Sequence, residues 1–336
     1  MTSGPAFHNY HLTTEDSGLT LAAVLRRMRS NDSWSQVRRL IHNRHVQVNG
    51  NLCVDDGRKL KTGDVLKVWK EPRAAPVKPD DVRIVHLDAH LLVVEKPAGV
   101  TTLRYSEELN WPDQRRQLQP TLDEMIRQIL ARKTKSRAAR PVRGHIPVTP
   151  SIRPVHRLDR DTSGLMVFAR LAEAERRLVQ MFRKHDMHRA YLAIAHGEVH
   201  AHTIETQLVR DRGDGLRGSS RKPGAGQRAV THIRPIEHLE GYTLVECRLE
   251  TGRTHQIRIH LAEAGHMVCG EKVYTHSYHG QPTNDRSGAQ RQALHAAELG
   301  FAHPMTGKRM EFKTPLPPDM TRLLERLRGR KPKPEA

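Results

Sequence analysis

A short proline-rich segment divides this chain into two parts whose hydrophobic patterns differ. Residues 71–80 read EPRAAPVKPD and contain three prolines, which is typical of a linker because proline interrupts both helices and sheets. Before this segment, apolar residues recur at helical spacing, and after it short apolar runs typical of strands predominate. A chain of 336 residues is long enough for about two domains. We therefore expect a small unit at residues 18–70 and a larger, strand-rich domain at residues 81–320.

The N-terminal unit is predicted to contain two helices packed on a small sheet. Ser33 is a candidate N-cap for the second helix, and Asn49-Gly50 is a strong signal for a two-residue hairpin. Residues 1–17, which precede the unit, are expected to be flexible. The apolar positions of the two helices are Leu21, Val24, Leu25, Met28, Val37, Leu40 and Ile41. The basic residues of the second helix and the turn after it include Arg38, Arg39 and Arg44.

The larger domain is predicted to have an α+β fold, with a mixed, mainly antiparallel central sheet and flanking helices. A helix is expected around Thr121–Arg132. Residues 165–170, LMVFAR, are typical of a buried strand, and residues 171–185, LAEAERRLVQMFRKH, are typical of an amphipathic helix. The many short strand segments that follow favour such a sheet.

The charge of the chain is strongly positive and unevenly distributed. Lys and Arg number 56 against 37 Asp and Glu, a formal net charge of +19, which favours an acidic partner and above all nucleic acid. Residues 125–160 hold ten basic residues and one acid, and we expect a basic insertion at about residues 131–153 that grips nucleic acid. A charged surface loop without a ligand is the alternative. The basic C-terminal tail is placed at residues 321–336. Aromatic residues make up only 4% of the chain, which disfavours binding built mainly on base stacking.

Several classes of protein are excluded by what the sequence lacks. No apolar run approaches the roughly 20 residues that a membrane-spanning helix needs, and the N-terminus has no apolar signal core, so a cytoplasmic protein is expected. The three cysteines form no CxxC pair, which argues against a disulfide framework or a zinc module. His255, His260 and His266 crowd one stretch, but without a Cys pair or an HExxH pattern we interpret them as core or surface histidines. We therefore expect no metal site.

The most chemically suggestive stretch is VHRLDRDTSGLMVFAR, residues 155–170. Asp159 stands among His156, Arg157 and Arg160, directly before the predicted buried strand. Nearby cations favour the ionised form of a carboxylate, and an ionised carboxylate in a fixed position can act as a nucleophile or a base. Thr162-Ser163-Gly164 can form a tight turn. From the residues alone, a purely structural ion-pair turn is an equally valid interpretation.

The segment HRLDRDTSG, residues 156–164, closely resembles the signature of the RluA-type pseudouridine synthases. The resemblance extends over most of residues 80–320, through LLVVEKPAGV, HRAYLAIAHGEV, GQRAVTHIRPIE, LETGRTHQIRIHLAEAGHMVCGEKVY and LHAAELGFAHPMTGKRMEFKTPLPPDM. Several motifs in the same order are far more specific than one. The segments SQVRRLIHNRHVQVNG and KTGDVLKV likewise resemble the small RNA-binding domain of ribosomal small-subunit protein four, the alpha-L motif.

The resemblance implies roles for particular residues. Asp159 would be the catalytic aspartate, Arg258 would pair with it, and Tyr191 would lie against the target base and assist proton removal from C5. The residues that would contact RNA or substrate are His156, Arg157, Leu294, Arg38, Arg39 and Arg44. The implied reaction isomerises uridine to pseudouridine and needs no cofactor. Whether Asp159 attacks C1′ or deprotonates the sugar is left open by the sequence.

One position departs from the family pattern. An aspartate usually follows the glycine after the long motif, whereas this chain has Gly270-Glu271. The substitution is conservative, and we expect residue 271 to lie away from Asp159. Little effect on the site is therefore predicted.

The resemblance favours large-subunit ribosomal RNA, of the 23S type, as the substrate. The oligomeric state is left open by the sequence, with a monomer as the default. A transfer-RNA-directed synthase, or a non-catalytic RNA-binding or ribosome-assembly factor, is the alternative. A glycoside hydrolase is a third hypothesis, with Asp161 as the second carboxylate that such enzymes usually need. A basic protein is a poor match for neutral sugars, which counts against it.

Overall fold

The computed structural model describes residues 7–49, 51–70, 72, 77–104, 108–110, 116, 119–137, 151–220, 222, 224–276 and 283–329. Contacts within the chain divide it into two compact units, residues 1–76 and 77–336. Each unit has its own hydrophobic core. The three cysteines, Cys53, Cys247 and Cys269, are buried and free.

The smaller unit packs two helices against a four-stranded sheet. Its elements are β1 (Phe7–His11), η1 (Thr14–Asp16), α1 (Leu21–Met28), α2 (Trp34–His42), β2 (Val46–Val48), β3 (Asn51–Leu52) and β4 (Val65–Trp69). The strand order is β1-β4-β2-β3, with antiparallel pairings. The predicted N-cap is confirmed, because Ser33 Oγ accepts a hydrogen bond from Gln36 N at 3.2 Å. The predicted hairpin is confirmed as well, since Val48 pairs with Asn51 across a two-residue turn.

The N-terminal residues of this unit differ from the expectation of flexibility. Strand β1 pairs along its whole length with β4, from Phe7 opposite Trp69 to His11 opposite Val65, and η1 follows it. The partner strand comes late in the unit. No local pattern in residues 1–17 could therefore indicate the pairing.

The larger unit is built on one sheet of eleven strands. The strands are β5 (Arg83–Leu87), β6 (Leu91–Lys96), β7 (Arg153–Pro154), β8 (Ser163–Ala169), β9 (His188–His196), β10 (His202–Val209), β11 (Gly218–Ser219), β12 (Gln227–Leu239), β13 (Tyr242–Leu249), β14 (Leu294–Ala302) and β15 (Arg309–Lys313). The helices are η2 (Pro79–Asp81), α4 (Leu122–Arg137), α5 (Ala172–Lys184), α6 (Gln256–Glu263) and α7 (Pro318–Leu327).

The strand order confirms the predicted mixed, mainly antiparallel sheet. Its main path runs β11-β10-β12-β13-β9-β14-β8-β6-β5, while β15 pairs with β14 and β7 with β8. Strands β8 and β14 pair in parallel. The other pairings among the described residues are antiparallel.

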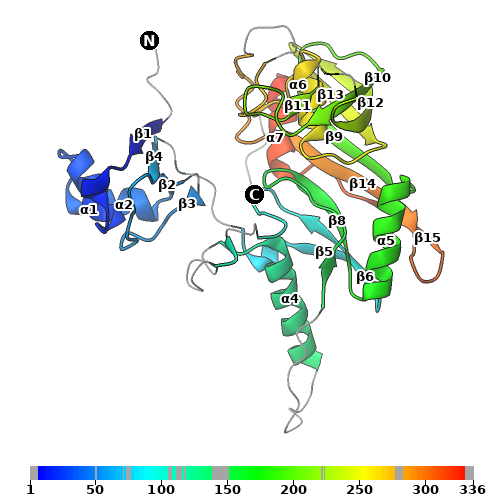
Figure 1. Ribbon diagram of the computed structural model, residues 1–336, viewed down its shortest axis with the longest axis horizontal. Helices are drawn as coiled ribbons and strands as arrows, with labels where there is room; N and C mark the ends of the chain where they lie inside the picture. Colours follow the sequence, from blue (N-terminus) through cyan, green and yellow to red (C-terminus); the bar gives the residue numbers. More distant parts are fainter. Residues whose placement is uncertain are drawn as a thin grey trace. The chain divides into compact units, whose positions relative to one another are not determined.

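The centre of the sheet is covered on both faces. Leu91 and Val93 of β6 belong to the core cluster that includes α5, whereas Leu92 and Val94 belong to the cluster that includes α4 and α7. Because side chains alternate along a strand, β6 buries both of its faces. Every residue of β8 is buried in the same way, which confirms the strand predicted there. Figure 1 shows α5 alongside β8.

Two predicted basic segments contain more regular structure than expected. The helix predicted around Thr121–Arg132 extends to Arg137, so the first part of the predicted insertion is helical. Residues 138–150 of that prediction lie outside the described residues, and its last residue, Arg153, begins β7. The tail predicted from residue 321 begins instead within α7, whose Met320, Leu323 and Leu324 are buried in the core. None of the helices described is long and apolar enough to cross a membrane.

The turn before β8 spans residues 159–162, earlier in the chain than the predicted turn at Thr162-Ser163-Gly164. Strand β8 already begins at Ser163, and the turn is closed by Thr162 N, which donates to Asp159 O at 3.2 Å. Gly164 adopts φ +117°, and a Cβ there would stand 2.3 Å from Ala296 O of β14. Only glycine permits this approach. The parallel pairing of β8 and β14 beside the Asp159 turn therefore depends on Gly164.

Candidate active site

The turn that carries Asp159 is fixed to the end of β6 by a buried lysine. Lys96 is fully buried, and its Nζ donates to the carbonyl oxygens of Thr162 (2.7 Å), Arg160 (2.9 Å) and Pro97 (3.0 Å). Burial lowers the pKa of Lys96 to about 7. Two of the three carbonyls belong to the Asp159 turn. Lys96 therefore holds the backbone of this turn in one position.

The Asp159 carboxylate lies between an arginine and a histidine. Arg258 Nη1, from α6, donates to Asp159 Oδ2 at 2.9 Å, as the resemblance implied. On the other side, His255 Nε2 lies 3.7 Å from Asp159 Oδ1, which exceeds hydrogen-bonding distance. His255 Nδ1 is 2.7 Å from the Tyr274 hydroxyl, and burial lowers the pKa of His255. One carboxylate oxygen is thus engaged, while Oδ1 makes no hydrogen bond to these two neighbours.

Arg258 is itself held by Glu271, the residue that departs from the family pattern. Arg258 Nε donates to Glu271 Oε2 at 2.6 Å and Nη2 donates to Oε1 at 2.8 Å, in the bidentate geometry that favours strong pairing. Both side chains are buried, at 7% and 1% exposure. Burial alone would lower the pKa of Arg258, but the hydrogen bonds and charge of Glu271, followed by those of Asp159, raise it above its usual value.

The expectation that residue 271 lies away from Asp159 is therefore wrong. Burial would raise the pKa of Glu271, yet the hydrogen bond and charge of Arg258 lower it below its usual value. Backbone N–H groups of Lys272 (2.8 Å) and Val273 (2.9 Å) also donate to Glu271 Oε1. Glu271, Arg258 and Asp159 form one chain of charged hydrogen bonds. A single side chain separates the unusual residue from the candidate catalytic carboxylate.

Five predicted residues come together around one cavity. Asp159, Arg258, Tyr191, Leu294 and Arg157 all contribute to its lining. Tyr191 lies on β9, paired with Ala296 of β14, and burial raises the pKa of its phenol. The central strands β9 and β14 thus supply one wall of the cavity. The Asp159 turn and the segment before and at the start of α6 supply most of its other lining residues.

His156, predicted to contact RNA or substrate, is not among the residues that line this cavity. Its Nε2 accepts a hydrogen bond from Val167 N at 3.1 Å, and its ring stacks on Phe182 of α5, with centroids 4.6 Å apart. Burial lowers the pKa of His156 to about 3, so the ring is neutral at physiological pH. In the structure His156 packs between the Asp159 turn and α5 and not at the cavity, which differs from the predicted contact with substrate.

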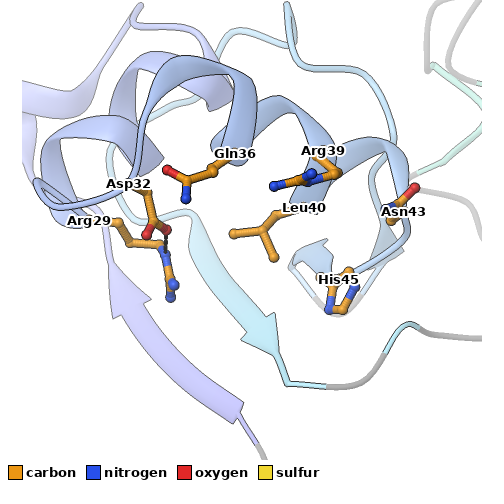
Figure 2. Close-up of a pocket in the computed structure, with 7 residues that line it drawn as sticks. All are labelled: Arg29, Asp32, Gln36, Arg39, Leu40, Asn43 and His45. Carbon is orange, nitrogen blue, oxygen red and sulfur yellow. Dashed lines mark hydrogen bonds and ion pairs between the residues drawn. The ribbon is translucent and has the colours of Figure 1, made fainter.

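The three arginines predicted to bind RNA from the smaller unit differ in their surroundings. Arg38 and Arg39 are exposed on α2, and Arg38 Nε lies 3.3 Å from an Asp56 carboxylate oxygen. Arg44 follows the helix with φ 68°, in the left-handed region. Arg39 lines a hollow of about 260 Å³ together with Arg29, Asp32, Gln36, Leu40, Asn43 and His45. Figure 2 shows the Arg29–Asp32 pair on one side of this hollow and His45 on the other. RNA contact at this surface stays a prediction.

The crowded histidines do not converge on one point. His255 lies beside Asp159, whereas His260 is buried and bonded to Thr206 (3.0 Å) and Thr231 (2.9 Å), with its pKa lowered to about 4 by burial. His266 Nδ1 donates to His196 O at 3.0 Å. Within the described residues, two other groups could hold a metal ion: Asp88, His90 and His303, and His196, Cys269 and Asp285. Neither group includes a residue that lines the cavity around Asp159.

Three residues around Asp159 were not singled out as site residues from the sequence: His255, Tyr274 and Glu271. The sequence pattern indicates His255 only as a possible metal ligand. Tyr274 lies three residues after Glu271, in a stretch where the pattern indicates no site residue. A signal for Glu271 existed in the departure from the family pattern. The contact between Glu271 and Arg258 could not be deduced from it, because that contact depends on the turn after α6 that brings residue 271 back to Arg258.

The family model described as RNA pseudouridylate synthase matches residues 90–263, and the S4 domain model matches residues 19–66. Because the first match spans more than half of the chain, the chain belongs to the RNA pseudouridylate synthase family and is an isomerase.

Curated relatives agree with this assignment. A ribosomal large subunit pseudouridine synthase D of Zymomonas mobilis subsp. mobilis is 36% identical, over 94% of this chain and 96% of the relative. An uncharacterized RNA pseudouridine synthase of Bacillus subtilis is also 36% identical, over 88% and 91%. A ribosomal large subunit pseudouridine synthase D of Escherichia coli O157:H7 is 32% identical, over 93% and 91%.

A solved structure shows the same fold. Human RNA pseudouridylate synthase domain containing 4 superposes with a TM-score of 0.55 at 23% identity, covering 73% of this chain and 93% of that one.

Proposed function

We propose that this enzyme converts specific uridines of large-subunit ribosomal RNA into pseudouridine, with Asp159 as the catalytic carboxylate. The observation that carries the mechanism is the chain of hydrogen bonds from Glu271 through Arg258 to Asp159, in a cavity that also contains Tyr191. The names of the relatives and the S4 domain support ribosomal RNA as the substrate. A cytoplasmic location, where ribosomal RNA is available, fits this proposal.

The proposed reaction is balanced without any added reagent. The N1–C1′ bond breaks, the uracil turns, and a C5–C1′ bond forms. The base loses the proton on C5 and gains one on N1. The arrangement around Asp159 suits either attack on C1′ or removal of a sugar proton, because Oδ1 is the oxygen left available when Arg258 engages Oδ2.

The other lining residues have roles that follow from their chemistry. Tyr191 packs against the base, and its raised pKa keeps the phenol neutral as the base arrives. Leu294 supplies an apolar wall. An enzyme that reaches both the sugar and the base edge must extrude the nucleotide from its stack. Arg157, which is exposed at the edge of the cavity, contacts the RNA that remains stacked.

The glycoside hydrolase hypothesis lacks its second carboxylate. Asp159 is the one carboxylate among the described residues that line the cavity. Asp161 is exposed, and its carbonyl oxygen accepts a hydrogen bond from Arg291 at 2.9 Å. The two carboxylates therefore do not flank a common substrate position, as such hydrolysis requires.

The test is position-resolved mapping of pseudouridine in total RNA from cells that lack this gene. We expect particular sites in large-subunit ribosomal RNA to disappear, to return with the wild-type gene, and to stay absent with Asp159→Asn. Sites lost from transfer RNA instead would transfer the proposal to that substrate. Restoration by Asp159→Asn would remove Asp159 from the mechanism and support a non-catalytic role.

A further inference from the structure

A second cavity lies beside the active site and is lined by three arginines. Arg210 follows β10, Arg217 precedes β11, and Arg253 lies in the turn before α6. The cavity holds about 350 Å³. Its other lining residues are Leu208, Val209, Gly226, Gln227, Thr254 and Ile259. No acidic side chain is among these lining residues.

The three arginines differ from their neighbours in having no carboxylate partner among the described residues. In the same region, Arg212 pairs with Asp214 at 2.9 Å and Arg228 pairs with Glu205 at 2.7 Å. Arg253 Nε instead donates to a backbone carbonyl oxygen, that of Arg228, at 3.0 Å. The chain thus neutralises the arginines around this cavity and leaves positive charge concentrated within it. Such a cavity favours an anion, and the planar guanidinium group suits phosphate in particular.

The cavity adjoins the catalytic cavity at the turn before α6. Arg253 lines both of them. Burial lowers the pKa of His255, which lies beside Asp159, and the positive charge of Arg217 adds to this effect. A ligand in the second cavity would lie next to a nucleotide held at Asp159.

We propose that Arg210, Arg217 and Arg253 form a subsite for a backbone phosphate of a nucleotide adjacent to the flipped uridine. This inference rests on the proposed function, because it requires that the molecule bound in the catalytic cavity is RNA. A phosphate contact carries no sequence information but fixes the register of the strand. The subsite thus sets which nucleotide of a bound loop faces Asp159, and sequence choice is left to other contacts.

The test uses the full chain and RNA hairpins that carry the uridine located by the mapping above. One phosphate at a time, on either side of this uridine, is replaced by an uncharged methylphosphonate. Affinity is measured for wild type, Arg217→Gln and Arg210→Gln over a range of KCl concentrations. The matched control is Arg309→Gln, because Arg309 is exposed on β15 and already paired with Glu311. Thermal unfolding establishes that each variant is folded.

We expect one neutral linkage to weaken wild-type binding about tenfold, and to weaken Arg217→Gln much less. The slope of log affinity against log salt should fall by about 1 in Arg217→Gln and stay unchanged in Arg309→Gln. Equal losses in wild type and Arg217→Gln at every linkage, or a slope equal to that of the control, would overturn the subsite. If the mapped uridine lies outside ribosomal RNA, the substrate proposal fails, whereas the same comparison on that RNA still decides the subsite.

Discussion

Replacing Glu271 by Gln tests how far the position of Asp159 depends on a residue that never touches the substrate. The substitution keeps the size of the side chain and removes its charge. It leaves the buried guanidinium of Arg258 with Asp159 as its remaining carboxylate partner, and it places an NH₂ group among N–H donors. Removing one partner of a buried ion pair costs about 3–5 kcal/mol. We expect the free energy of unfolding to fall by that amount.

The same change should lower kcat more than it raises KM. Glu271 lies behind Arg258 and not among the residues that line the cavity, so RNA affinity should change little. A displacement of Asp159 by about 1 Å can cost about 10²-fold in rate. The assay is release of tritium from RNA labelled at C5 of uridine, under saturating and subsaturating RNA. Urea unfolding of the same preparations gives the stability change.

Two further variants make the result decisive. Glu271→Asp restores the charge and the residue usual in the family, and should recover kcat to within about tenfold, since bidentate pairing is retained. Glu250→Gln removes an exposed carboxylate that pairs with Arg228 and His232, and should cost at most about 1 kcal/mol. The reasoning is refuted if folded Glu271→Gln turns over at the wild-type rate.

Three other expectations follow from the structure and the charge pattern. Gly164→Ala should destabilise the protein by more than about 2 kcal/mol, because its Cβ would meet Ala296 O at 2.3 Å; a melting temperature equal to wild type would contradict this. Burial lowers the pKa of both His260 and His295 to about 4, so the unfolded chain takes up protons below about pH 6.5 while the folded chain does not. With His156, whose pKa burial lowers to about 3, included, stability should fall by about 5–6 kcal/mol between pH 7 and pH 5, and the fall should shrink by about a third in a folded His260→Gln variant; a pH-independent unfolding free energy would rule this out. Deletion of residues 133–150 should weaken RNA binding and flatten its salt dependence. An unchanged salt slope would instead support the alternative that this segment is a charged surface loop without a ligand.

Local patterns predicted those parts of the fold that depend on neighbours in sequence. The cap at Ser33, the hairpin at Asn49 and the buried strand β8 are each encoded within a few residues, and all three are present. The N-terminal strand β1 was missed because its partner β4 lies at the other end of the smaller unit. Helix α7 was not predicted, because the many basic residues of this segment suggested a tail even though it contains the three apolar residues that the helix buries.

The site residues could be predicted where they occupy positions that match the motifs of the family. Asp159, Arg258 and Tyr191 line one cavity, and the Asp159–Arg258 ion pair is present. Position in the sequence was a poor guide for His156, which is adjacent to the Asp159 turn but whose ring stacks on Phe182 of α5. Glu271 could not be placed, because its contact with Arg258 depends on the chain returning after α6.

The most direct test of the account is tritium release by purified Asp159→Asn under single-turnover conditions, with RNA binding measured on the same preparation. We expect wild-type affinity for the RNA hairpin and no release of the C5 proton above background. Release at a rate near that of wild type would show that the carboxylate held by Arg258 and Glu271 is not the catalytic group.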